Sequence, residues 1–298
     1  AQGHPNDHRT RGPDAPLIDD PTFGCAFTHG TDFSTVWAWD NTGQGNQKVK
    51  LIGLQVRNTG NRGRAVEGNN EIADGSLIDQ CICHSTDSNA SFVIQFWNGA
   101  DELGNPPIVK RTLVISNSDD KDGFRTFNGN SLKGDVNAIT VVSTNTTTAN
   151  GIFESGREST PLDNSISMGF GTDYSGSFIG DHNASSDATA PGANSLTGLA
   201  LADIFENPVA GDAGDWRIKS GAAVVGAGDL STSTLEDIIN QVRNDPPTIG
   251  AWELLASGGT AVGGAPQIAP VSASGALKLL VGLSGSPGVG AVSGAGSV

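Results

Sequence analysis

Basic residues are scarce in this sequence. Lysine and arginine together number 17 among 298 residues, against 32 aspartates and glutamates, which gives a formal net charge of −15. An acidic chain repels the phosphate backbone of nucleic acids and the anionic headgroups of lipids. We therefore expect neither nucleic acid nor a membrane as a partner, and we interpret the charge as a source of solubility and self-repulsion.

Cysteine and long apolar runs are also rare. Cys25, Cys81 and Cys83 are too few for the disulfide framework of a small secreted domain. Cys81 and Cys83 lie two residues apart in a strand-like run, so both point to one face while His84 points to the other. We expect buried core thiols rather than a metal site. No stretch of 18 apolar residues is present, so no membrane span is expected.

Turn-forming residues take the place of the missing charged and apolar ones. Glycine occupies 41 positions, and hydrophobic residues make up only 36% of the chain. Frequent Pro, Asn, Asp, Ser and Thr add to this pattern, which is typical of short strands joined by many turns.

A repeat of 26 to 31 residues runs from Val49 to about His182. Each repeat contains a short apolar core after a turn, and these cores are centred on Val66, Val93, Phe124, Ile152 and Phe178. A second, alternating apolar segment precedes each core in the same order. It reads "LIGLQVRNTG" at 51 in the first repeat and "VNAITVVSTN" at 136 in the fourth.

These repeats predict an all-β solenoid, the right-handed parallel β-helix. Each repeat holds strands too short to form a domain alone, and stacking pairs each strand in parallel with its neighbours. The five centres should then form one inward column. Sandwich strands also recur every 8 to 12 residues, but the fixed order of two strand types favours the solenoid. Residues 69–76 and 98–107 are interpreted as loop insertions. One helix is expected at 232–244, with Leu235, Ile238, Ile239 and Val242 on one face.

The segments "DWRIKSGAAVVGAG" (215–228) and "DPPTIGAWE" (245–253) resemble the closing segment of many bacterial and phage β-helix proteins of the pectate-lyase-like type. Thr248 stands where that pattern has Asp. The resemblance implies the fold and carries little information on activity, because lyases, hydrolases, adhesins and virion proteins share it. A solenoid end needs a cap. The residues expected to form that lid are Trp216, Ile218, Ile249 and Trp252.

The sequence after Ser257 has one charged residue, Lys278. Its Gly/Ala/Ser/Val units resemble low-complexity segments of phage virion and fibre proteins. We expect a longer parent chain or a segment that orders against another subunit; a flexible linker is the alternative. The predicted organisation is an N-terminal segment with the first coils (1–48), the β-helix with its cap (49–256) and this tail (257–298).

No nucleophile elbow, P-loop, H-E-x-x-H or paired C-x-x-C motif occurs in the sequence. β-helix enzymes that cleave polysaccharides use acidic side chains on one sheet. The residues that fit this requirement are Asp79, Asp119, Asp120, Asp122, Arg125, Glu154, Arg157 and Glu158. Arg125 and Glu154 occupy similar positions on successive repeats, so we expect them about 5 Å apart. They would form a structural ion ladder or a catalytic pair.

The segment "NSDDKDG" (117–123) is crowded with acids in the manner of a Ca²⁺ loop. Asp119, Asp120 and Asp122 would be its ligands, although the spacing differs from that of an EF-hand. A polar turn is the preferred interpretation. We expect no other cofactor.

Taken together, the sequence favours a structural protein of a phage virion over an enzyme. The chain would be a β-helix spike, fibre or decoration module that contacts other virion proteins. The resemblance also implies homo-oligomers, often trimers. The first alternative is a lyase or glycoside hydrolase that depolymerises host surface polysaccharide. A secreted bacterial adhesin is the second.

Overall fold

The structure is a computed structural model. It describes residues 26–29, 35–40, 50–59, 64–69, 76–85, 92–98, 108–117, 121–128, 135–144, 148–155, 159–210 and 214–254. These residues all belong to one compact unit, Ala1–Leu254. The tail and most of segment 1–48 lie outside the described residues, so the predicted boundaries at 48 and 256 stay predictions.

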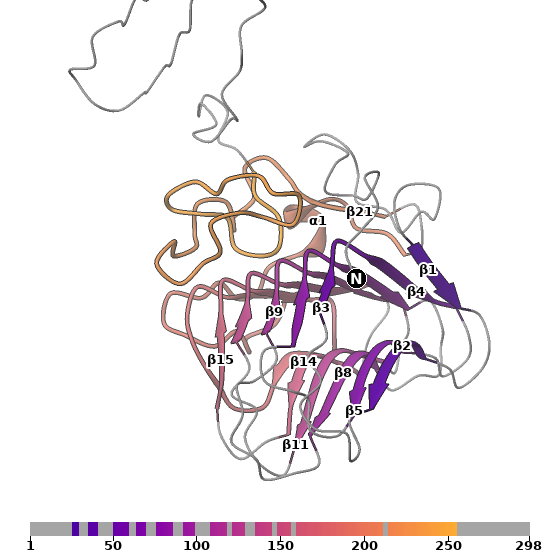
Figure 1. Cartoon of the computed structure of the whole chain (residues 1–298). Coiled ribbons are helices and arrows are strands. Elements are labelled where there is room, and N and C mark those ends of the chain that lie inside the picture. The colour runs from indigo at the N-terminus through magenta and orange to yellow at the C-terminus, as the bar shows by residue number, and fades with distance from the viewer. Residues whose placement is uncertain are drawn as a thin grey trace, which may run out of the picture. The chain divides into compact units, whose positions relative to one another are not determined.

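Three parallel sheets run along the molecule and enclose its core (Figure 1). Sheet A contains β3 (Lys50–Ile52), β6 (Leu77–Asp79), β9 (Ile108–Lys110), β12 (Asp135–Asn137), β15 (Thr160–Asp163) and β18 (Phe178–Ile179). Sheet B contains β1 (Ala26–His29), β4 (Gln55–Asn58), β7 (Ile82–Ser85), β10 (Leu113–Ser116), β13 (Thr140–Ser143), β16 (Ile166–Met168) and β19 (Ala184–Ser185). Sheet C contains β2 (Thr35–Asp40), β5 (Arg64–Asn69), β8 (Phe92–Asn98), β11 (Asp122–Asn128), β14 (Asn150–Glu154) and β17 (Thr172–Ser175).

Each coil contributes one strand to each sheet, and each strand pairs in parallel with the strand one coil away. Leu51, for example, is in register with Ile78, which is in register with Val109. This arrangement confirms the predicted parallel β-helix. It also explains the composition, because two- to seven-residue strands joined by turns need few long apolar runs.

The inward column on sheet C differs in two positions from the predicted one. Val66 pairs with Ile94, and the column continues through Phe124, Ile152 and Tyr174. Val93 is buried but lies one residue out of register, and Phe178 belongs to β18 of sheet A. The error has a physical cause: coils differ in loop length, and the last one spans only 22 residues from Ile152 to Tyr174.

Sheets A and B meet at a sharp corner that recurs in every coil. One residue in each corner has a positive φ, and these residues are Gly53, Gln80, Arg111, Ala138, Asn164 and His182. In each of these except His182, the corner N–H donates to a carbonyl of the next coil, as in Gly53 N to Asp79 O at 3.1 Å. This hydrogen bond offsets the strain of left-handed backbone in residues other than glycine.

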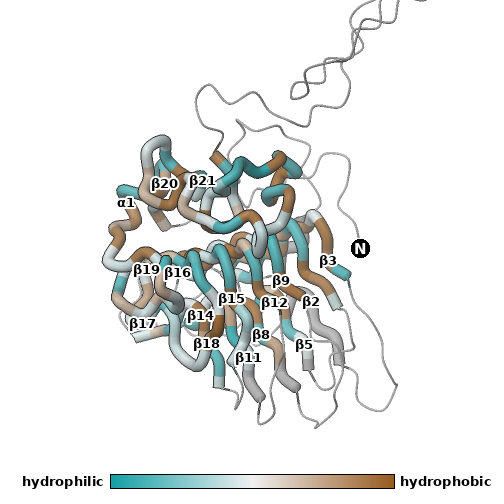
Figure 2. Tube along the Cα trace, turned by 90° about the vertical axis from the view of Figure 1, so that its left-hand side faces the viewer, coloured by the Kyte–Doolittle hydropathy of each residue, from teal (hydrophilic) through white to brown (hydrophobic). Residues whose placement is uncertain are grey.

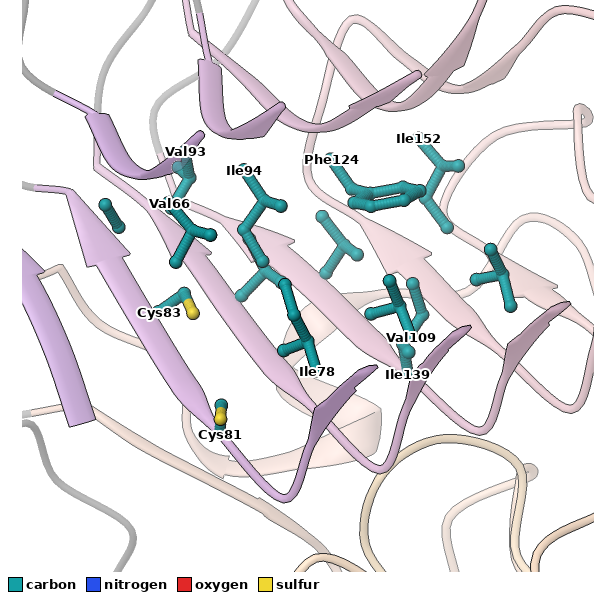
Figure 3. Packing of buried hydrophobic residues seen from close by; sticks show 14 of the residues in the cluster. Val66, Ile78, Cys81, Cys83, Val93, Ile94, Val109, Phe124, Ile139 and Ile152 are labelled. Atoms are coloured by element: carbon teal, nitrogen blue, oxygen red, sulfur yellow. The ribbon is translucent and has the colours of Figure 1, made fainter. Parts of the chain in front are cut away.

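The core inside the three sheets is apolar and contains both predicted thiols. Cys81 and Cys83 are buried, as expected, and neither forms a disulfide (Figure 3). Phe124 is stacked between Ile94 and Ile152 and meets the ring of Phe96 edge-on at 5.8 Å. At the last coil, Phe178 and Ala190 pack against this core.

The outer face of sheet B is also apolar and is covered by the chain that follows β19. Outward side chains of sheet B include Leu113, Val142 and Ile166, and they form a second hydrophobic cluster with later residues. The covering chain contains α1 (Leu201–Ile204), β20 (Phe205–Asn207) and β21 (Asp215–Ile218); β20 and β21 pair antiparallel. We name residues 201–254 the cover. Figure 2 shows it lying along the stack of coils.

The predicted end lid is therefore wrong in its location. Trp216, Ile218, Ile249 and Trp252 are all buried, but they pack on the flank of sheet B with Leu113 and Ile166. The reason is that outward positions of sheet B are apolar, and burying them requires a covering layer.

The helix expected at 232–244 does not form. Residues 232–244 are turns, with an antiparallel bridge between Glu236 and Val242 and a positive φ at Asn240. Ile238 and Ile239 are buried, whereas Leu235 is 74% exposed. The apolar spacing that predicted a helix is thus explained by Ile238 and Ile239, which pack against sheet B. No helix in the described part of the chain is long and apolar enough to cross a membrane.

We predict that Phe124→Ala lowers the free energy of unfolding by about 3–5 kcal/mol, because it leaves a cavity in the column. Leu235→Ala is the matched control at an exposed site and should change stability by less than about 0.5 kcal/mol. Urea unfolding followed by fluorescence measures both. Equal effects would contradict the placement of Phe124 in a packed core.

Candidate functional site

The outer face of sheet C contains two of the residues predicted from the sequence, Asp122 and Arg125. The position after the inward column faces outward, and Glu67, Gln95, Arg125 and Phe153 lie there in one row. The position before the column also faces the core, as Val93 and Gly123 show, so Arg64, Phe92 and Asp122 precede it in a second outward row.

Arginine and phenylalanine alternate on this face over four successive coils. The guanidinium of Arg64 lies 4.5 Å from the ring centroid of Phe92, and Arg125 lies 5.9 Å from Phe92 and 5.0 Å from Phe153. Such cation–π contacts stabilise neighbouring coils against one another. Arg64 also forms an ion pair with Glu67. The sequence did not reveal this stack, because its members come from repeats with unequal loops.

Asp122 joins two coils. Its Oδ1 accepts hydrogen bonds from the backbone N of Asn150 at 2.7 Å and from Asn150 Nδ2 at 3.0 Å. Burial raises the pKa of Asp122, and the Asn150 bonds and the charge of Arg125 oppose the increase. These contacts give the carboxyl a structural role in the coil stack.

The expected pairing of Arg125 with Glu154 is wrong. Arg125 is in register with Phe153, and Glu154 is in register with Thr126. Arg125 therefore faces outward, whereas Glu154 is buried on the inner side. Burial raises the pKa of Glu154, with opposing contributions from Thr160 and Ser177. A one-residue difference in register moves a side chain to the opposite face.

The outward carboxylates described on sheet C are Glu67 and Asp122. They lie two coils and three strand positions apart, so their Cα atoms are about 14 Å apart. Paired carboxyl groups of glycosidases flank the scissile bond and act on the substrate. Here each carboxylate is instead engaged within the fold, Glu67 by Arg64 and Asp122 by Asn150.

Asp79 belongs to the corner between sheets A and B. It accepts two hydrogen bonds from Arg111, Nε to Oδ1 at 2.7 Å and Nη2 to Oδ2 at 2.5 Å, and Lys110 Nζ lies 3.8 Å away. Desolvation by burial lowers the pKa of Arg111. Asp79 and Glu236 favour its charged form and outweigh this effect, so the pKa is raised overall.

Four other predicted residues lie outside the described part of the chain: Asp119, Asp120, Arg157 and Glu158. Of the three proposed Ca²⁺ ligands, the structure thus describes only Asp122, which contacts Asn150. Among the described residues, no group of three or more His, Cys, Asp or Glu side chains is arranged to hold a metal ion. The calcium loop stays a prediction.

A second polar region, which the sequence did not predict, lies where the cover crosses the corners. We name residues 229–240 the strap. Asn164 donates to Asp229 O and Thr232 Oγ1, Asn137 to Thr232 O, Arg111 to Glu236, and Gln80 to Asp237 O and Asn240 Oδ1. Corner side chains of four successive coils thus bind one continuous segment.

We name residues 243–253 the closing motif. This motif forms a buried ionic cluster at the end of the cover. Arg243 and Glu253 are both fully buried and lie 3.3 Å apart, Nη1 to Oε2. Thr248 donates to Glu253 through its backbone N at 2.8 Å and through Oγ1 at 3.1 Å. Asn244 Nδ2 adds a bond at 2.9 Å. The motif residues therefore hold the cover together.

Two other buried carboxyl groups have a raised pKa. Asp237 lies beside this cluster, and Asp173 lies in the last coil. Asp237 accepts bonds from the backbone N of Ile239, Gln241 and Glu253. Burial raises its pKa to about 6 despite these bonds and the charge of Arg243. Burial likewise raises the pKa of Asp173 to about 6, although Ser186 and Phe170 donate to its carboxylate.

The chain matches no known protein family, and no curated protein matches it.

We predict that the protein is more stable in mild acid. Both carboxyls bind protons more tightly in the folded state than in the unfolded state, so stability is lost as pH rises from about 4 through 6. The expected loss is about 3 kcal/mol for each group. Urea unfolding between pH 4.5 and 8 measures it.

The variant Asp237→Asn should have a flatter pH dependence, whatever its absolute stability. Exposed Glu206→Gln removes the same formal charge and should keep the slope of the parent protein. An unchanged slope in Asp237→Asn would disprove the assignment.

Proposed function

We propose that the chain is a structural protein of a phage particle, a rigid β-helix spike, fibre or decoration module. The main support is the use of polar side chains in the described structure. Asp122, Asp79 and Glu253 contact neighbouring coils or the cover, and thereby hold the fold together. A solenoid linked in this way is suited to stiffness.

Two sequence features support the same proposal. The closing segment and the Gly/Ala/Ser/Val tail both resemble parts of phage proteins, and the net charge of −15 favours solubility. The proposal also includes four more specific features: right-handed winding, the pectate-lyase-like type, partners in the virion and a trimeric state.

We predict that the protein co-purifies with intact phage particles at a fixed copy number. Quantitative mass spectrometry of gradient-purified virions measures that number, with a non-structural phage protein as the negative control. Recovery only in the bacterial culture fluid would instead support the secreted adhesin.

A polysaccharide-cleaving enzyme is the second candidate. The observation in its favour is the outer face of sheet C, where Arg125 and Phe153 lie beside Asp122 over successive coils. Arginine and aromatic rings suit an anionic sugar chain. The contacts of Glu67 with Arg64 and of Asp122 with Asn150 argue against a two-carboxylate hydrolase.

We predict no release of reducing ends or 4,5-unsaturated sugars from a panel of bacterial surface polysaccharides. Parent protein, Asp122→Asn and exposed Asp203→Asn would be assayed together. Release by the parent and by Asp203→Asn, but not by Asp122→Asn, would overturn the structural assignment in favour of the enzyme.

A further inference from the structure

The last described residues, Glu253 and Leu254, are held from several sides. The backbone N of Glu253 donates to Asp237 at 3.0 Å, and its carbonyl accepts from Gln241 Nε2 at 3.0 Å. Leu254 N donates to Thr248 Oγ1 at 3.3 Å, and Asn244 Nδ2 donates to Leu254 O at 3.2 Å. Main chain and side chain are thus both fixed where the tail begins in the sequence.

Arg243 connects this point to the rest of the closing motif. Its Nη1 donates to Thr248 O at 2.9 Å and its Nη2 to Gly250 O at 2.7 Å, besides the ion pair with Glu253. The guanidinium and the carboxylate are both fully buried. Removing one partner would leave an uncompensated buried charge, so the cluster resists partial opening.

The motif is attached directly to the solenoid. Gly250 N donates to Asn164 O at 2.8 Å, and Ala251 N donates to Thr140 Oγ1 at 2.9 Å. Gly250 has φ +102°, and a Cβ there would lie 2.7 Å from Thr140 Oγ1. Only glycine allows this close approach.

From these contacts we infer that Arg243, Asn244, Thr248 and Glu253 form a mechanical clamp. Tension applied beyond Leu254 passes through the clamp to the parallel strands of sheet B, and the cover does not peel away. The use of such a clamp rests on the proposed structural role, in which a neighbour holds the chain by its terminal segments. The clamp itself is a property of the isolated chain.

The test is single-molecule force spectroscopy of the full chain, pulled from its two ends. In the parent protein, the strap and closing motif should stay attached until the solenoid itself unfolds. In Glu253→Gln, a separate low-force event should precede that unfolding. It should release about 90 Å of contour length, the extended length of residues 229–254.

Arg217→Met is the matched control. It breaks an ion pair in the same cover, Arg217 with Asp215, which precedes the strap. It should leave the low-force region unchanged. If Glu253→Gln does not fold, Asn244→Ala removes only the two bonds from Asn244 Nδ2 and should produce the same early event.

An early release of this length in the parent protein would overturn the inference, as would identical force curves for parent and clamp variants. Either result would leave the composition of the virion, and hence the proposed function, to its own experiment.

Discussion

The backbone hydrogen bonds between coils are the interaction on which the structure depends. The strands of the three sheets obtain their partners from adjacent coils, so each coil must turn at the same place. The left-handed corner residue meets this requirement between sheets A and B, in Gly53 and in five non-glycine residues. In all of them except His182 the N–H bonds to the next coil, so the turn continues the ladder. Loop length varies elsewhere because only the corner and the strands are constrained.

Three sheets enclose one core, but sheet B has a second apolar face. The cover buries it and needs polar contacts of its own, since its backbone is mostly irregular. Arg243, Asp237 and Glu253 supply them for the closing motif, and corner side chains supply them for the strap. The "IGAWE" sequence is thus explained by packing and hydrogen bonding on a flank. Trp252 and Ile249 fill the apolar layer, Gly250 allows close approach, and Glu253 satisfies buried donors.

The solenoid could be predicted from the sequence because its two strand types recur in a fixed order. Register could not, because loops of unequal length separate the repeats; this misplaced Val93 and paired Arg125 with Glu154. The helix was wrong because Ile238 and Ile239 are buried through turns. The strap was missed since Gln80, Arg111 and Asn164 contact residues 65 to 160 positions away, which no local pattern encodes.

The strap binds corner side chains of four successive coils, from Asn164 back to Gln80. Its length is therefore matched to a fixed number of coils, each about 4.8 Å high. An insertion or deletion of one repeat between these corners would put the strap out of step with its partners. The strap therefore fixes the number of coils in this part of the solenoid. Related chains with a different number of coils would be expected to gain or lose coils before Gln80. Among the described residues, the corner side chains that bind the strap start at Gln80.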